Sequence, residues 1–435
     1  MQRKHRRIIF FVFLILFLIS LPLILLYTGG YRYNIKKSKL EKTGNLLVSA
    51  ETKNINVDID NKSYYGKGEL RIKNILPGEY LIKITKESYF DWQKKLTINS
   101  ALTTFIKNVR LFKQNLPINL VESIDKIYPS PDKNKILYSS YDKEADRYSL
   151  LMVYADNGQD KKILTSEYPI DSAVWSPDSY KFYIKTGGAF RVVDAREGEI
   201  ELSFVKNEIY NLKWHGKNSL VLFAEMPGGI YKIDLFFRST SEIYSISKRV
   251  DDFEIIGNNL YFIDQYNLKQ IDLKNSEMVY VPLERNGYKI KTIVAEKIYI
   301  LNEQRGKLQI FDLPLHKLST PILLVNAKNF DIIGNSLLFY NDFELWTYDF
   351  ASGSKELITR IGANIKKGYW VNGTDYIIFI LENQIKIIEM DKRDQRQIIE
   401  LVKFEDINDI LLTKKYDLYF IGKMNKSFGL FKLEI

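Results

Sequence analysis

An acidic residue recurs at near-regular spacing through the C-terminal part of the chain. The series is Asp156, Asp194, Asp234, Asp272, Asp312, Asp349, Glu389 and Glu434. Paired carboxylates serve glycosidases as acid and base, so the series could supply such chemistry to a surface polysaccharide. A catalytic pair would be confined to one or two repeats, whereas these acids hold one equivalent position in every repeat. Runs such as Asp349-Phe-Ala-Ser-Gly353 are typical of carboxylates that close turns through backbone N–H groups. We therefore interpret the series as turn formers and predict no catalytic residue.

Other reactive side chains are scarce. The chain has no cysteine, which excludes disulfides, thiolate zinc sites and cysteine nucleophiles. The histidines are His5 in a basic tail, His215 in a predicted turn and His316 between predicted strands, an arrangement that cannot form an ordinary metal site. No Gly-x-Ser-x-Gly, phosphate-binding loop, dinucleotide fingerprint or His-Glu-x-x-His motif occurs. The sequence predicts no metal and no cofactor. It has five tryptophans, most of which we expect in the core: Trp92, Trp175, Trp214, Trp346 and Trp370.

The elements that carry the acids are themselves repeated. One strand-like block recurs eight times, at Ile136, Phe182, Leu220, Leu260, Ile298, Leu337, Tyr376 and Leu418. A turn precedes each block, an acid closes the next strand, and a third strand follows in the first seven repeats, as at 162–165 and 356–359. A unit of roughly 40 residues with about four short strands is typical of a propeller blade. We therefore predict an eight-bladed β-propeller over residues 114–435.

The last repeat ends at Ile435, before its outermost strand. The segment Pro117–Glu122 precedes the first repeat and has no other predicted partner. We expect it to supply the missing strand, because closure of the ring hides strand edges that would otherwise favour aggregation.

Two turns in the early repeats carry a family signature. They read Tyr128-Pro-Ser-Pro-Asp132 and Trp175-Ser-Pro-Asp178. Both resemble the Trp-Ser-Pro-Asp-Gly turn of TolB-like propellers, a group of bacterial envelope proteins. The resemblance implies the fold and an envelope setting, but propellers have many unrelated activities, so it implies no reaction.

Before the repeats, residues 44–113 show apolar side chains with a period of two. The apolar positions are Leu46, Val48, Val57, Ile59, Leu70, Ile72, Leu81, Ile82, Ile84, Leu96, Ile98, Phe105, Ile106, Val109 and Leu111. The pattern predicts a small β-sandwich of about six strands. We expect a hairpin turn at Asp60-Asn61 and a type II turn at Pro77-Gly78, with Gly78 at positive φ.

This segment resembles the PEGA domain family. The matching stretches are Gly44-Asn-Leu-Leu-Val48, Val57-Asp-Ile-Asp-Asn61, Leu76-Pro-Gly-Glu-Tyr80 and Ser88-Tyr89. The name-giving turn departs from the family pattern, since it reads Ala50-Glu-Thr-Lys53, and Ser88 replaces a glycine. The resemblance implies a non-catalytic surface module of the kind found beside membrane segments.

An apolar segment lies near the N-terminus. Residues 8–27 contain no charged residue and are interrupted only by Ser20 and Pro22. Such a helix is about 30 Å long, which matches a bilayer core, and tyrosines follow at its far end. The alternative is a cleaved signal peptide, but the stretch is too long for one and no small-residue cleavage site follows. We predict a basic tail and membrane anchor at 1–27 and a linker at 28–43.

The positive charge gathers around this anchor. Residues 1–42 hold nine Lys or Arg and one acid, so +8 of the net charge of +10 lies there and +2 remains for the folded part. This distribution favours lipid headgroups as the partner and argues against nucleic acid. The tail Arg3-Lys-His-Arg-Arg7 favours a cytoplasmic N-terminus, although the basic residues beyond the span bring the positive-inside count close to a tie.

Together these features predict a single-pass membrane protein of the cell envelope with a large extracytoplasmic part. Its leading function is binding or scaffolding, with a protein, peptide or glycan as partner. The alternative is a propeller enzyme, a glycoside hydrolase or lyase that acts on surface polysaccharide. A transmembrane sensor ranks last, since the seven residues before the span are too few for a signalling domain.

Overall fold

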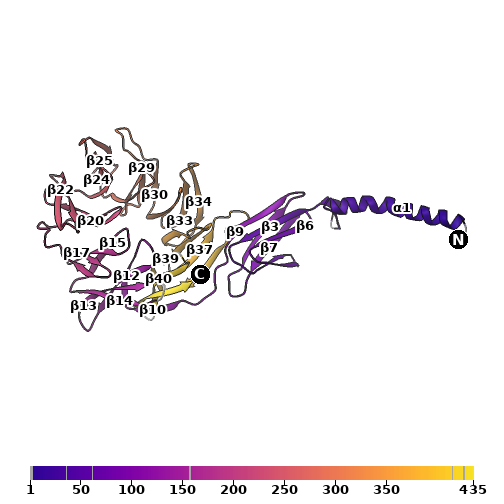
Figure 1. Ribbon diagram of the computed structural model, residues 1–435, viewed down its shortest axis with the longest axis horizontal. Coiled ribbons are helices and arrows are strands. Elements are labelled where there is room, and N and C mark those ends of the chain that lie inside the picture. Colours follow the sequence, from indigo (N-terminus) through magenta and orange to yellow (C-terminus); the bar gives the residue numbers. More distant parts are fainter. Residues whose placement is uncertain (1–2, 36, 61, 156–157, 414, 425–426) are drawn as a thin grey trace.

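The computed structural model describes residues 3–435 except 36, 61, 156–157, 414 and 425–426. It places an N-terminal helix, a small sandwich and a ring of sheets in one row (Figure 1). Strands dominate, which confirms the all-β prediction with one apolar helix.

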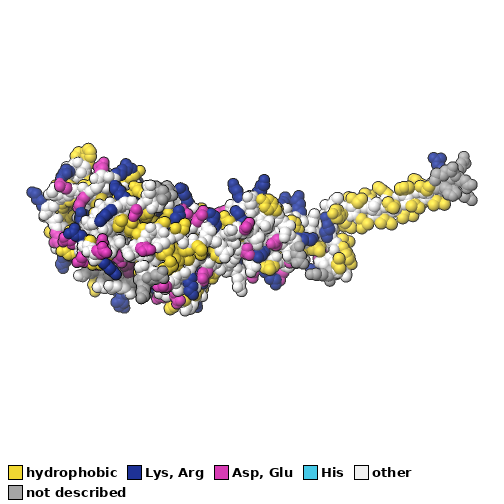
Figure 2. All heavy atoms as spheres, turned by 90° about the horizontal axis from the view of Figure 1, so that it is seen from below, with side chains coloured by type: hydrophobic (Ala, Val, Ile, Leu, Met, Phe, Trp, Pro, Cys, Tyr) yellow, Lys and Arg dark blue, Asp and Glu magenta, His cyan; other side chains and the backbone are white. Residues whose placement is uncertain are grey.

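The helix α1 spans Arg3–Thr28 and contains Pro22. Within it, Arg6–Thr28 is long and apolar enough to cross a membrane, and none of it is buried in the protein. In Figure 2 it projects from the sandwich as a rod of hydrophobic side chains.

A two-stranded hairpin follows α1 where the sequence predicts a linker. Strand β1, Tyr31–Asn34, pairs antiparallel with β2, Lys39–Lys42. The hairpin is tied at its base, because the Thr43 hydroxyl donates a hydrogen bond to the Gly30 carbonyl at 2.7 Å. The segment between α1 and the sandwich is therefore a folded element, which the lysine-rich composition did not indicate.

The sandwich has two sheets, as predicted. The first is three-stranded in the order β6-β3-β9, and the second is four-stranded in the order β5-β4-β7-β8. The strands are β3 Gly44–Ala50, β4 Ile55–Ile59, β5 Lys62–Gly66, β6 Glu69–Ile75, β7 Gly78–Thr85, β8 Trp92–Ile98 and β9 Thr103–Val109. Strands β3 and β9 pair in parallel, a long-range contact that no local pattern announces.

Most predicted core positions of the sandwich are buried in one cluster, and two details differ from the prediction. Leu81 and Phe105 point to solvent, because alternation along β7 and β9 places their neighbours Ile82 and Ile106 in the core. Gly78 does not adopt a positive φ but begins strand β7, and the left-handed residue nearby is Asn74 at φ 59°. The predicted Asp60-Asn61 turn falls in part outside the described residues, and Asp60 itself has φ 50°.

Within the described part of the chain, eight four-stranded sheets follow the sandwich. The strands of the first four are β11 Ile124–Pro129, β12 Lys135–Asp142, β13 Arg147–Tyr154, β14 Asp160–Ser166, β15 Ile170–Trp175, β16 Lys181–Thr186, β17 Ala189–Asp194, β18 Gly198–Ile200, β19 Asn211–His215, β20 Asn218–Met226, β21 Gly229–Asp234, β22 Ser239–Ser245, β23 Asp252–Ile256, β24 Asn259–Asp264, β25 Asn267–Asp272 and β26 Met278–Pro282. Those of the last four are β27 Lys289–Val294, β28 Lys297–Asn302, β29 Lys307–Asp312, β30 Leu323–Asn326, β31 Asn329–Ile333, β32 Ser336–Tyr340, β33 Glu344–Asp349, β34 Ser354–Arg360, β35 Ile365–Trp370, β36 Tyr376–Leu381, β37 Gln384–Glu389, β38 Ile398–Lys403, β39 Asp406–Leu412, β40 Asp417–Met424, β41 Ser427–Glu434 and β10 Ile118–Glu122.

The last sheet joins the two ends of the repeat region. Its strand order is β10-β41-β40-β39, so the segment predicted to supply the missing strand does pair with β41. The hydrophobic clusters lie between successive sheets, and one of them joins the last sheet to the first through Tyr419 and Tyr138. Each sheet therefore buries both faces against its neighbours, which a single sheet could not do.

The turns between the first two strands of the first two sheets are closed by short polar side chains. In the second sheet, the Ser176 hydroxyl lies 2.6 Å from Asp178 and accepts the backbone N–H of Lys181 at 2.9 Å. Ser130 and Asp132 repeat this arrangement in the first sheet. The Ser-Pro-Asp signature is thus a turn device that sets where each second strand begins.

Candidate functional site: the sandwich–ring junction and the inner rim

Four of the eight recurring acids close turns, as the sequence predicts. Asp234 accepts the backbone N–H groups of Phe236 and Phe237, and the bond from Phe237 lowers the pKa of Asp234 below its ordinary value. Asp194, Asp272 and Asp349 hold equivalent turns. Asp312 instead pairs with Lys297, and Asp156 lies outside the described residues.

The last two members of the series depart from this pattern, which corrects the uniform turn interpretation. Glu389 and Glu434 face the sandwich: Glu389 pairs with Lys94, and Glu434 pairs with Lys113. The sequence does mark them, because they are glutamates where the earlier repeats have aspartate. The longer side chain reaches beyond its own turn and meets another domain.

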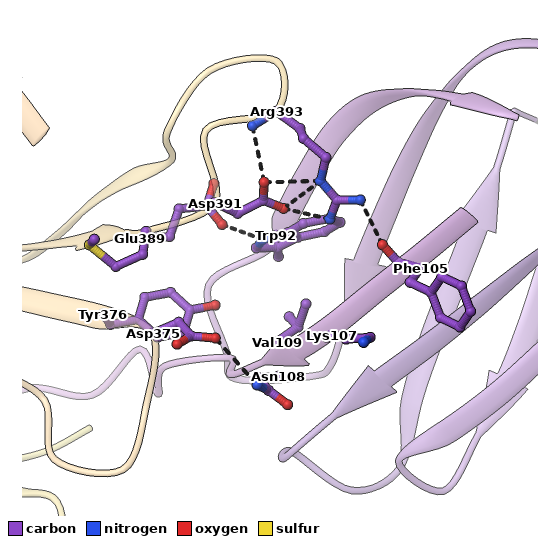
Figure 3. Close-up of a pocket in the computed structure, with 11 residues that line it drawn as sticks. Trp92, Phe105, Lys107, Asn108, Val109, Asp375, Tyr376, Glu389, Asp391 and Arg393 are labelled. Carbon is purple, nitrogen blue, oxygen red and sulfur yellow. Dashed lines mark hydrogen bonds and ion pairs between the residues drawn. The ribbon is translucent and has the colours of Figure 1, made fainter. Parts of the chain in front are cut away.

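Glu389 and Lys94 form the centre of the junction, by which we mean the contact surface between the sandwich and the last two sheets. The Lys94 ammonium lies 2.6 Å from Glu389 Oε1, and the two side chains are 0% and 4% exposed. Trp92 Nε1 donates to Glu389 Oε2 at 2.8 Å (Figure 3). The backbone N–H of Gln397 donates to the same carboxylate at 2.8 Å. Every charge at this centre is therefore paired, as burial requires.

Lys94 is also held by the main chain of the propeller. Its ammonium donates to the carbonyls of Asp391, Arg393 and Gln395 at 2.7–2.9 Å. Strand β8 alternates buried and exposed residues, and Lys94 shares its buried face with Trp92 and Leu96. A lysine at a core-facing position of a strand was the sequence signal for this contact.

Polar contacts extend the junction along the β37–β38 connection. Arg393 forms an ion pair with Asp391 and donates to the Phe105 carbonyl at 2.7 Å, as Figure 3 shows. Asp394 accepts the backbone N–H of Lys95 at 2.9 Å. Because these bonds involve the backbone of the sandwich, they fix its orientation as well as its distance from the ring.

An apolar and aromatic contact completes the junction. Phe112 is fully buried among side chains of the last two sheets and meets the Tyr376 ring edge to face at 5.1 Å. The Arg110 guanidinium lies 3.3 Å from the centre of the Tyr416 ring. Beside this contact, a cavity of about 390 Å³ lies between the domains and is bordered by Trp92 and Asp375. The sandwich is thus docked by charge, hydrogen bonding and apolar burial together.

The innermost strands of the ring carry the carboxylates that a propeller enzyme would use. Lys213 pairs with Asp252 at 3.1 Å, and Lys367 pairs with Asp409 at 2.7 Å. In each pair the two residues come from neighbouring sheets, β19 with β23 and β35 with β39. Asp252 and Asp331 also accept backbone N–H groups of the next sheet. These acids therefore bind the sheets to one another.

One inner-strand acid has an unusual protonation equilibrium. Burial raises the pKa of Glu254 to about 6, although nearby Lys213 partly offsets the effect. Burial likewise raises the pKa of Asp331. Within the described part of the chain, no three His, Asp or Glu residues lie close enough to hold a metal ion.

The remaining weighed residues have structural surroundings. His215 ends β19 half-buried, and its Nδ1 accepts the N–H groups of Lys217 and Asn218, while His316 is exposed. Trp175 and Trp214 are buried and donate to carbonyls of the preceding sheet. Trp92, Trp346 and Trp370 are buried or half-buried, so none of the five presents an open face for stacking. His5 lies at the start of α1.

An exposed aromatic pair stands out on the ring. Phe236 and Phe237 are 71% and 75% exposed, and their rings meet edge to face at 5.0 Å. They occupy the turn that Asp234 closes. The matching turns in neighbouring sheets present Arg196-Glu197 and Lys274-Asn275, so the pair is specific to this sheet. The repeat pattern did not indicate the pair, because Phe236 and Phe237 follow the recurring Asp234 and have no equivalent in the neighbouring repeats.

Comparisons with known proteins agree with this architecture. Residues 43–115 match the family model described as PEGA domain. The structure of Saccharomyces cerevisiae Sqt1 is similar to this chain with a TM-score of 0.52 and 11% identity, covering 74% of this chain and 99% of that one. BamB from Moraxella catarrhalis is similar with a TM-score of 0.45 and 12% identity, over 74% and 99% of the two chains. A search of the curated proteins finds no match. Likeness at such identity describes the fold alone. Residues 43–115 are thus a PEGA domain, and the chain that follows folds as a β-propeller.

Proposed function

We propose that this protein is a membrane-anchored, extracytoplasmic scaffold that presents one surface of its propeller to a protein partner. The exposed pair Phe236 and Phe237 carries the proposal, because aromatic residues that a turn holds out to solvent are typical anchors of protein interfaces. Asp234 keeps the turn in place, so little ordering would be needed on binding.

The surroundings of the pair favour a protein over a glycan. Leu220 of β20 is 40% exposed. Its carbonyl accepts the N–H of Leu235, the residue directly before the pair. Arg238 is engaged by Ser203 and Glu201 and does not extend toward the rings. Exposed apolar side chains of this kind suit an apolar protein surface.

The anchor and the junction give this surface a defined place. Helix α1 is long and apolar enough to span a bilayer, and the buried Lys94–Glu389 pair joins the sandwich to the propeller. The propeller would then face its partner in a fixed orientation above the membrane. The basic tail supports a cytoplasmic N-terminus.

The enzyme alternative has weaker support. Its signature would be a free carboxylate pair at the channel mouth, whereas Asp252 and Asp409 are ion-paired between sheets. Glu254 has a raised pKa, but its described neighbour Asp252 is already engaged by Lys213 and by the backbone. These contacts favour a structural role for the inner acids.

The test compares the full-length chain with a Phe236→Ser/Phe237→Ser variant, each tagged and isolated from native membranes after cross-linking in cells. We expect one reproducible protein adduct on the wild type and its loss in the variant. Leu318→Ser is the control, since Leu318 is 92% exposed in the corresponding connection of another sheet. An adduct that survives the double substitution, or binding of glycans alone on an array, would overturn the proposal.

The anchor is tested separately in intact cells. The chain should resist extraction by alkaline carbonate, and externally added protease should digest residues 44–435. Protection of that part would reverse the orientation, and release by carbonate would remove the anchor.

A further inference from the structure

A second cavity lies at the end of the sandwich that meets the hairpin and α1. It has a volume of about 550 Å³, and we call it the membrane-proximal pocket. Its polar lining includes Arg32, Asp60, Lys62, Lys73 and Tyr80. These residues come from β1, from the β4–β5 connection with the start of β5, and from β6 and β7.

The position of the pocket follows from its contact with the end of the span. The Arg32 guanidinium lies 3.6 Å from the centre of the Tyr27 ring and donates to the Tyr27 carbonyl at 2.8 Å. Tyr27 lies in the last turn of the apolar segment Arg6–Thr28. The headgroup layer extends about 5–7 Å beyond the hydrocarbon core, so a side chain stacked on Tyr27 lies within it. Arg32, which lines the pocket, therefore lies at headgroup depth when α1 spans a bilayer.

The charge of the pocket favours an anion. Arg32, Lys62 and Lys73 supply three positive charges against the single carboxylate of Asp60. Lys62 and Lys73 are exposed, and among the described residues neither has an acidic partner. Tyr80 lines the same wall, and its hydroxyl donates to the Leu76 carbonyl at 2.8 Å. A guanidinium fork beside two ammonium groups suits the oxygens of a phosphate.

The hairpin beside the pocket independently indicates a lipid surface. Ile35, Tyr33 and Leu40 are 83%, 58% and 52% exposed, although they lie next to the end of an apolar span. Lys37, Lys39 and Lys42 lie in the same hairpin, where Lys37 and Lys39 pair with Glu41. Apolar side chains mixed with lysines are typical of elements that lie in the membrane interface. Figure 2 shows Lys and Arg side chains around the place where the apolar rod meets the sandwich.

We propose that the membrane-proximal pocket binds the phosphate of an anionic phospholipid headgroup from the bilayer that holds α1. Arg32 and the two lysines contact the phosphate oxygens, and the apolar wall of Ile59 and Ile75 contacts the glycerol. The lipid source is favoured over a dissolved phosphate because α1 keeps the pocket in the plane of the headgroups, where the local lipid concentration is high. This inference rests on the anchoring part of the proposed function.

The test uses the full-length chain in detergent, with native mass spectrometry to count bound lipid. Phosphatidylglycerol and phosphatidylcholine are added in separate arms, and inorganic phosphate in a third. The variant is Lys62→Gln/Lys73→Gln. The matched control is Lys53→Gln/Lys67→Gln, which removes two exposed lysines from the connections at the opposite end of the sandwich.

We expect the wild type and the control variant to retain phosphatidylglycerol in preference to phosphatidylcholine. The pocket variant should lose roughly 30-fold in retention, since each lysine near an anionic lipid surface contributes roughly a factor of five. If the pocket variant retains as much phosphatidylglycerol as the wild type, the proposed site is wrong. If inorganic phosphate displaces the lipid, the ligand is a dissolved phosphate and not a lipid headgroup. Binding is measured on the isolated chain, so loss of the protein partner would leave this result unchanged, whereas carbonate release of α1 would remove only its anchoring premise.

Discussion

The Lys94 ammonium lies 2.6 Å from the Glu389 carboxylate, across an interface between two domains, and both side chains are almost completely buried. Two buried charges are costly when either is removed, because the partner is then left in a low-dielectric environment. Three carbonyls of the β37–β38 connection also depend on Lys94 as their donor. This contact makes the relative placement of sandwich and propeller a specific property of the chain.

Lys94→Ala should therefore undock the sandwich. We expect the docked arrangement to lose about 3–5 kcal/mol, the range for breaking a buried ion pair. Limited trypsin digestion of the full-length chain should show faster cleavage after Lys113, which is paired with Glu434 in the docked form. Lys95→Ala is the control, because the Lys95 side chain is 61% exposed and pairs at the surface with Glu79. Similar digestion of both variants would contradict this account.

Glu254 should make stability depend on pH. Burial raises its folded-state pKa to about 6 from an ordinary 4.5, so the folded state binds the proton more tightly than the unfolded state does. The contribution of Glu254 to the free energy of unfolding therefore declines as pH rises between these values. The loss approaches about 2 kcal/mol at neutral pH. Denaturation at a series of pH values should show Glu254→Gln equal to the wild type at low pH and more stable at neutral pH.

Glu199 should make stability change with pH in the opposite direction, because its hydrogen bonds with Arg191 lower its pKa in the folded state. Glu199→Gln should cost stability at neutral pH and cost nothing below the folded-state pKa. If both variants shift in the same direction, the cause assigned to Glu254 is wrong.

Closure of the ring should depend on the absence of a side chain at position 429. A Cβ on Gly429 would lie 2.9 Å from the Val121 carbonyl of β10, so strand pairing must shift to admit it. We expect Gly429→Ala to lower the free energy of unfolding of the propeller by about 1–3 kcal/mol, as overpacking does. Gly362→Ala is the matched control, since a Cβ at that position would have no other atom within 4 Å. Calorimetry of both variants would decide, and equal melting temperatures would count against closure through β10.

The Ser-Pro-Asp turn should contribute measurably to its sheet. Ser176 is fully buried, lies within hydrogen-bond distance of Asp178 and accepts the Lys181 N–H, so Ser176→Ala removes both contacts and leaves that backbone N–H without its acceptor. The expected loss is about 1–3 kcal/mol in chemical denaturation. The exposed Ser241→Ala in β22 should be neutral. A loss of equal size there would show that the hydroxyl of Ser176 has no special role.

Much of the architecture could be predicted because it depends on short-range pattern. Alternating apolar residues indicated the strands of the sandwich, and the recurring block from Ile136 to Leu418 indicated the repeated sheets. The carboxylate of Asp234 acts on N–H groups two and three residues away, so its turn role was readable from its neighbours. Leu81 and Phe105 were placed in the core wrongly because runs of adjacent apolar residues hide which one points inward.

The candidate functional surfaces were harder to predict from the sequence. Glu389 looked like one more turn acid, since its partner Lys94 lies 295 positions earlier, and strand pairing of β3 with β9 has the same long-range character. The pocket that Arg32 forms with Lys62 and Lys73 likewise joins residues from separate strands. By itself the sequence determined the apolar helix, most of the strands and the repeated character of the C-terminal part, because hydrophobic periodicity and turn chemistry act over a few residues. The tertiary structure decided which carboxylate is buried against the sandwich and which cations share a pocket, because those contacts exist only after distant strands have packed.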